Sequence, residues 1–168
     1  MPKRSTHSKT PDAIKLLKDD HTEVTALFAK YEKGRNRMSE DQKEQLARQI
    51  CQMLKVHTQI EEEIFYPACR EQVKSADDLL AEATVEHQGA KELISKIEGG
   101  EAGSEEFDAE VTVLGEYVKH HVKEEQNELF PKVKKSKMDL KALGQQLAER
   151  KSSLMEGEES EQSSMAAE

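Results

Sequence analysis

The chain lacks several features that mark whole classes of protein. It has no tryptophan, only four prolines, and no run approaching the ~20 apolar residues of a membrane span. No apolar segment follows the basic N-terminus MPKRSTHSK, so we expect no secretory signal. Its two cysteines, Cys51 and Cys69, are expected on one helix, where a rise of ~1.5 Å per residue would separate them by ~27 Å, too far for a disulfide. These absences predict a cytoplasmic protein with free thiols.

What the chain does contain is charge. Charged residues make up 35% of the sequence and hydrophobic residues another 35%, with a net charge of -9. An acidic surface repels phosphates and anionic lipid, so we expect neither nucleic acid nor a membrane as a partner. Helix formers such as alanine, leucine, glutamate, lysine and glutamine dominate, which predicts an all-α protein with a narrow core.

Capping and breaking residues divide the chain into segments. Helix starts are predicted at Thr10-Pro11, at Ser39 with Gln42, at Ser75 with Asp78, and at Ser104. Pro67 and Pro131 are expected to kink or end the second and fourth helices. The predicted parts are a flexible basic arm (1–10), a helical bundle (11–135), a short C-terminal helix (136–151) and an acidic disordered tail (152–168).

Long helices joined by short loops favour antiparallel neighbours. The predicted fold is therefore an up-down-up-down antiparallel four-helix bundle, with the short C-terminal helix as an addition.

One stretch of the second helix, VHTQIEEEIFYP at residues 56–67, is unusual for a buried face. Apolar residues mark that face at Leu46, Ile50, Met53, Ile60 and Ile64. His57 and Glu61 lie in the middle of it, about 40° apart around the helix. An imidazole and a carboxylate are thus predicted to point into the core.

The same pattern returns in VKHHVKEEQNELFP at residues 118–131. Glu125 follows His121 by four residues and Pro131 follows it by ten, just as Glu61 and Pro67 follow His57. The first helix carries one inward candidate, His21, and the third helix carries another, His87. The chain therefore resembles two copies of a helical hairpin, each with one histidine followed by H-x-x-x-E.

The pair His120 and Glu124 has the same spacing as His121 and Glu125. His120, however, is about 100° further round the helix and is predicted to face outward. Glu62, Glu63, Glu124 and Glu128 are interpreted as solvated charges, and Glu86 as exposed, although it is nearer the core edge. Tyr117 is interpreted as a packing residue, with the alternative that it reaches the site from one turn before His121.

The chemistry follows from the cost of burying charge. Two facing carboxylates repel each other in a core, and two divalent or trivalent cations remove that difficulty. Four imidazoles would supply terminal nitrogen ligands and two carboxylates would bridge the ions. This donor set suits iron, with manganese or zinc as alternatives. The competing interpretation is a bundle without metal whose histidines are hydrogen-bonded core residues.

The arrangement H…HxxxE…H…HxxxE, with its FYP and LFP endings, resembles the hemerythrin-like family of HHE cation-binding domains. The resemblance covers about residues 11–135 and implies a four-helix bundle around a non-haem di-iron centre, bridged by oxygen and two carboxylates. It implies terminal ligands at His21, His57, His87 and His121, and bridging ligands at Glu61 and Glu125.

The sequence departs from the oxygen-carrying hemerythrins, which have a second histidine one turn from the third-helix ligand. Ala83 and Lys91 occupy those positions here. The oxygen carriers also have a longer H-x-x-x-x-D spacing on the last helix. One iron would then have one ligand fewer, which argues against simple oxygen carriage. A ferritin-like site is excluded because it needs E-x-x-H on two helices, and no histidine of the candidate helices has an acidic residue three positions before it.

Three functions are consistent with these patterns. The first is a cytoplasmic di-iron protein that binds or senses O₂, NO or peroxide, or that handles iron. The second is a di-iron enzyme that consumes peroxide or NO. The third is a helical interaction module without metal. The sequence identifies no protein partner.

Overall fold

The structure is a computed structural model that describes residues 10–165, with side chains described as far as Gly157. Except for Thr10, the predicted N-terminal arm lies outside the described residues, as do residues 166–168. The α-helices are α1 (Ala13–Gly34), α2 (Glu40–Ile60), α3 (Tyr66–Gln72), α4 (Asp77–Gly99), α5 (Glu105–Glu124), α6 (Phe130–Lys135) and α7 (Leu140–Met165). Residues 10–165 contain no β-strand.

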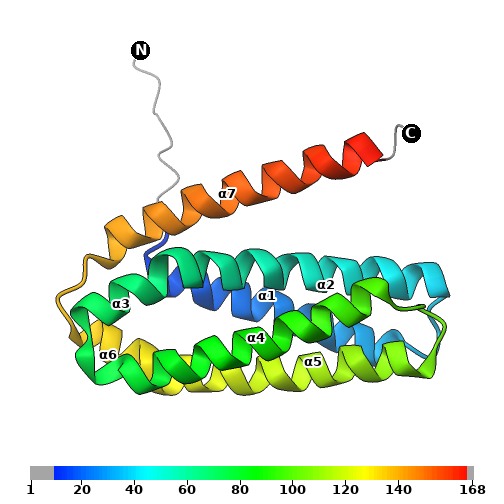
Figure 1. Ribbon diagram of the computed structural model, residues 1–168, viewed down its shortest axis with the longest axis horizontal. Coiled ribbons are helices and arrows are strands. Elements are labelled where there is room, and N and C mark those ends of the chain that lie inside the picture. The colour runs from blue at the N-terminus through cyan, green and yellow to red at the C-terminus, as the bar shows by residue number, and fades with distance from the viewer. Residues whose placement is uncertain (1–9, 166–168) are drawn as a thin grey trace, which may run out of the picture.

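The four long helices α1, α2, α4 and α5 form the predicted bundle (Figure 1). Each contacts the next along the chain, and α5 contacts α1, which closes the ring. The short helices α3 and α6 continue the paths of α2 and α5, and α7 lies outside the bundle against α1 and α2. No helix within residues 10–165 is long and apolar enough to cross a membrane.

Two of the predicted helix starts are confirmed and two are corrected. Ser39 caps α2 in a capping box, and Ser104 caps α5 by accepting a hydrogen bond from a backbone N–H. Asp12, and not Thr10, caps α1, because its carboxylate accepts the backbone N–H of Lys15. Ser75 caps nothing, because it lies inside a 3₁₀ turn (Lys74–Ala76) that leads directly into α4.

The two prolines do not end their helices, because a wider turn precedes each of them. Single π-helical turns, Glu61–Phe65 and Glu125–Leu129, connect α2 to α3 and α5 to α6. Within the first, the backbone N–H of Tyr66 bonds to the carbonyl of Glu61, five residues back. The wider turn gives the proline ring room that an α-helix would not, so the helical path continues.

A polar layer divides the interior into two apolar clusters. One cluster contains Leu17, Phe65, Leu80 and Phe130, together with residues of α7. The other contains Tyr31, Ile50, Ile94 and Leu114. Between them lies the level of the predicted histidines, so each apolar half shields one side of that layer from water.

The C-terminal helix is longer than predicted. It was expected to end at Lys151, with a disordered tail beyond, but α7 continues to Met165. Residues 152–165 contain no proline, and their glutamates, glutamine, methionines and leucine favour or tolerate helix. Leu143 and Leu147 are buried against the bundle, so the first half of α7 provides the nucleus from which the rest extends.

The packing of α7 on α1 depends on Gly144. A methyl group at this position would overlap the backbone of Pro11, Asp12 and Ala13. We predict that Gly144→Ala lowers the free energy of unfolding by about 1–3 kcal/mol, because α7 must move away from α1. Urea denaturation followed by circular dichroism measures this change.

Gly157→Ala is the matched control, since it lies in the same helix with open space around it. There the gain in helix propensity should raise stability by up to about 1 kcal/mol. Equal effects of the two substitutions would show that α7 does not pack closely on α1.

Candidate metal centre

The structure brings all six predicted ligand residues into one buried layer. Four helices of the bundle each contribute a histidine, and each π-helical turn begins with a glutamate. Glu61 is 0% exposed and Glu125 is 2% exposed, so both carboxylates are removed from water. The residues are His21 on α1, His57 on α2, His87 on α4 and His121 on α5, with Glu61 and Glu125.

A first ligand set forms where α1 and α2 meet. His21 Nε2 lies 3.1 Å from Glu125 Oε2, and His57 Nε2 lies 3.1 Å from Glu61 Oε1. Although these distances are short, the angles are not those of hydrogen bonds, and none of the four atoms has a hydrogen-bond partner within the described chain. Buried polar atoms are nearly always satisfied in folded proteins, so four convergent unsatisfied ligand atoms fit a cation.

A second set lies beside the first, toward α4 and α5. Glu61 Oε2 lies 3.1 Å from His87 Nε2, and the Nε2 atoms of His87 and His121 are 3.2 Å apart. Glu61 thus offers one oxygen to each set. Glu125 Oε2 lies 3.1 Å from His21 Nε2 and 3.6 Å from His121 Nε2, so this oxygen stands between the sets. Each of the two sets could therefore hold a cation.

Each histidine is held from outside by a side chain of a neighbouring helix. His57 Nδ1 lies 3.1 Å from Asp20 Oδ2, and Glu62 Oε1 lies 2.9 Å from Nδ1 of the α4 histidine, His87. His121 Nδ1 lies 2.7 Å from Glu86 Oε2. A carboxylate only accepts, so each of these Nδ1 atoms donates its hydrogen and each Nε2 faces the ligand set.

The fourth histidine has a neutral partner. The side-chain amide of Gln126 lies 3.0 Å from His21 Nδ1, and an amide can present either a donor or an acceptor to the ring. The four contacts run in one direction around the bundle. In each contact, the outer residue belongs to one helix or to the π-turn that extends it. The histidine that it bonds to belongs to the next helix around the bundle.

Sequence reasoning missed these four outer residues. Glu62 and Glu86 were interpreted as solvated or exposed, which is wrong, because both carboxylates bond to histidines. No sequence pattern described above assigns a role to Asp20 or Gln126. A signal was present: each of the four directly adjoins a predicted ligand, in the pairs Asp20-His21, Glu61-Glu62, Glu86-His87 and Glu125-Gln126.

Without a cation, protons on His57 and His121 balance the charge of the carboxylates around them. Burial alone would raise the pKa of Glu61, but the neighbouring imidazoles of His57 and His87 hold that pKa well below its usual range. Burial would lower the pKa of His57, yet Glu61 and Asp20 outweigh it and raise that pKa to about 10. In the same way, Glu125 and Glu86 raise the pKa of His121 to about 9. A cation competes with these protons, so its apparent affinity should rise with pH toward these values.

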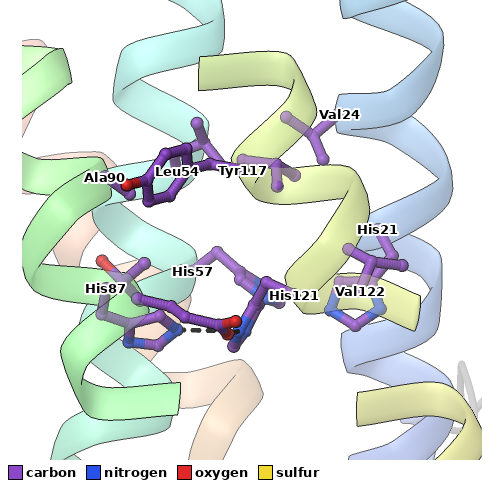
Figure 2. A pocket seen from close by; sticks show the side chains of 12 residues that line it. His21, Val24, Leu54, His57, His87, Ala90, Tyr117, His121 and Val122 are labelled. Carbon is purple, nitrogen blue, oxygen red and sulfur yellow. Dashed lines mark hydrogen bonds and ion pairs between the residues drawn. The ribbon is translucent and has the colours of Figure 1, made fainter. Parts of the chain in front are cut away.

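A small cavity adjoins the histidine layer on the side away from α7. Its volume is about 20 Å³, and Figure 2 shows Val24, Leu54, Ala90 and Tyr117 on one side of it and the four histidines on the other. A water needs about 10–15 Å³, so the space suits a molecule of one or two heavy atoms. Tyr117 and Glu86 line both this cavity and a surface groove of about 970 Å³.

His120 faces outward, as predicted. Its side chain is 63% exposed at the surface of the bundle. Its Nε2 atom lies 3.2 Å from Glu86 Oε1 and 3.3 Å from Glu124 Oε1. His121 is buried in the ligand layer.

Comparisons with known proteins show the family and the fold of the chain. The model of the Hemerythrin HHE cation binding domain matches residues 12–133, which includes every residue of both ligand sets. The chain is also similar in fold to the crystal structure of a Hemerythrin HHE cation binding domain-containing protein from Mycobacterium kansasii. The TM-score is 0.69 at 23% sequence identity, covering 86% of this chain and 87% of the other. No curated protein matches the chain.

The two adjacent histidines of α5 provide a matched pair of variants. We predict that His121→Ala weakens metal binding by at least about tenfold, because it removes a buried ligand atom, while His120→Ala changes it little. Titration of the metal-free protein with Fe²⁺ under anaerobic conditions measures both. Equal losses would show that the α5 register is different from the one described.

Proposed function

The chain belongs to the hemerythrin HHE cation-binding family, and on that premise we propose that it is a non-haem di-iron protein that binds or senses a small ligand. The ligand would be O₂, NO or peroxide, and handling of iron itself is the related alternative. The observation that carries the proposal is the group of four buried, unsatisfied atoms of His21, His57, Glu61 and Glu125, next to a second set that shares Glu61.

The residues present fit two metal ions. One would be held by the first ligand set, and the other by Glu61, His87 and His121. Imidazole and carboxylate together suit iron, and they would also accept manganese or zinc. When bound, iron would supply ligand binding and electron exchange.

The rest of the site keeps water and bulky molecules out. The outer ring of Asp20, Glu62, Glu86 and Gln126 fixes the histidine rings so that Nε2 points inward. Above the rings, the cavity is lined by apolar residues such as Val24, Leu54 and Ala90. A space of about 20 Å³ with an apolar lining favours a small uncharged molecule over a hydrated ion.

One observation favours an enzyme as the second candidate function. Glu86 joins the interior to the surface, since its two oxygens contact the buried His121 and the exposed His120. This pair offers a path by which a proton can reach the site, and reduction of peroxide consumes protons. Catalytic turnover of peroxide, as opposed to one equivalent consumed per site, distinguishes the enzyme from the binding protein.

The dinuclear proposal is tested by loading the protein with iron. We predict a plateau at two ions per chain and a higher melting temperature than that of the metal-free protein, which should remain helical. Metal that binds only the folded state adds about 4 kcal/mol at a thousandfold excess over its Kd. The two apolar clusters hold the metal-free bundle together.

Elemental analysis and thermal melts followed by circular dichroism provide the two readouts. A plateau at one ion would contradict a dinuclear site. Superimposable melts would favour the bundle without metal.

The role of the cavity is tested separately from metal binding. Ala90 lines the cavity and is 7% exposed, so Ala90→Val should fill it. We predict unchanged iron content but NO affinity lower by roughly tenfold to a hundredfold, in line with the effect of small steric changes in tight pockets. Titration of the reduced, iron-loaded protein with NO measures this.

Ala81→Val is the control, because Ala81 is exposed on the same helix. If both variants bind NO as tightly as the wild type, the cavity is not where the ligand binds.

A further inference from the structure

Tyr66 places its hydroxyl among the ligand atoms of the second set. The side chain is buried, and Oη lies 2.7 Å from Glu125 Oε1 and 3.2 Å from Glu61 Oε2. The same oxygen lies 3.3 Å from His87 Nε2 and 3.5 Å from His121 Nε2. Four ligand atoms therefore surround one phenol oxygen.

A neutral phenol has one hydrogen to share among these four ligand atoms. It donates this hydrogen to Glu125, the nearest of the four atoms. In the metal-free chain, the two carboxylates around this oxygen oppose a negative charge on it. A cation among the same atoms reverses that electrostatic balance, because it attracts the phenolate and screens the carboxylates.

The first ligand set has no such oxygen, although the two hairpins repeat each other. In the repeat, Phe130 corresponds to Tyr66, since each directly precedes the proline of its segment. The ring of Phe130 stacks on His21 at 5.9 Å, and the ring of Tyr66 stacks on His87 at 5.4 Å. The two aromatic residues thus occupy equivalent places, and only one of them carries a hydroxyl.

We propose that Tyr66 is a seventh protein ligand, whose phenolate oxygen binds the metal ion held by Glu61, His87 and His121. On binding, the O–H bond breaks heterolytically, the proton passes to solvent and the oxygen keeps the electron pair. This proposal rests on the dinuclear site proposed above. It makes the two metal positions chemically different: one has a hard anionic oxygen, and the other, next to Phe130, has none.

The two metal positions would then have different functions. A phenolate fills a position on the ion of the second set and favours its oxidised, more highly charged state. The position between His21 and His57 lacks that ligand, so it is the one with room for a small molecule. Both histidines line the cavity described above.

The test uses iron-loaded protein oxidised in air. Phenolate bound to ferric iron gives a visible charge-transfer band and, on excitation in that band, ring vibrations in the resonance Raman spectrum. We expect both in the wild type, and loss of both in Tyr66→Phe, with affinity for the second iron lower by at least about tenfold. The control is Tyr31→Phe, which removes another buried tyrosine hydroxyl, one bonded to Asp108 at the opposite end of the bundle, and should leave the spectrum unchanged.

The outcomes separate the two proposals. A wild-type protein that binds two irons but shows no phenolate vibrations would overturn the role of Tyr66 and leave the dinuclear site standing. The same holds if Tyr66→Phe binds two irons with unchanged affinity and spectrum. A wild type that never binds a second iron would overturn both. Because the Raman measurement on the wild type needs no variant, the result does not depend on whether Tyr66→Phe folds.

Discussion

Two ionisable carboxylates in the centre of a narrow bundle are the constraint on which the rest of the structure depends. Glu61 and Glu125 are 0% and 2% exposed, and isolated charges at such depth would cost more than the whole bundle gains. Protonation of His57 and His121, whose pKa values are raised, offsets this cost in the metal-free chain, and cations held by the four histidines would offset it in the loaded chain. Apolar clusters above and below keep water out, so the carboxylates must be neutralised from within the layer.

The same layer fixes how the helices are aligned. The Nδ1 atom of each histidine bonds to a residue of the neighbouring helix or of the π-turn extending it, and these contacts close a ring around the bundle. Sliding one helix along another would break such a contact at both of its neighbours. Apolar packing tolerates a range of alignments, whereas short polar contacts with defined angles do not. Gln126 is the neutral member of the ring, which leaves His21 with the least negative surroundings.

The helix α7 is connected to this network although it lies outside the bundle. Lys151 bonds to one oxygen of Asp20, whose other oxygen accepts from His57. Burial would raise the pKa of Asp20, but His57 and Lys151 together lower it, so this carboxylate stays ionised. Arg150 pairs with Glu63, which lies in the π-turn beginning at Glu61. Movement of α7 would therefore disturb His57, a residue of the first ligand set, through the side chain of Asp20.

The sequence alone was sufficient for the helical class, the family and six inward residues, four of them in two H-x-x-x-E repeats and two as single histidines, because helical period and spacing are local properties. It did not give the outer ring, since whether Glu62 or Glu86 meets water or a histidine depends on the neighbouring helix. It predicted a kink or an end at Pro67 and Pro131, because neither proline by itself reveals the π-turn, Glu61–Phe65 or Glu125–Leu129, that precedes it. Tyr66 follows Glu61 by five residues in the chain, but only the convergence of α2, α4 and α5 places its hydroxyl among four ligand atoms.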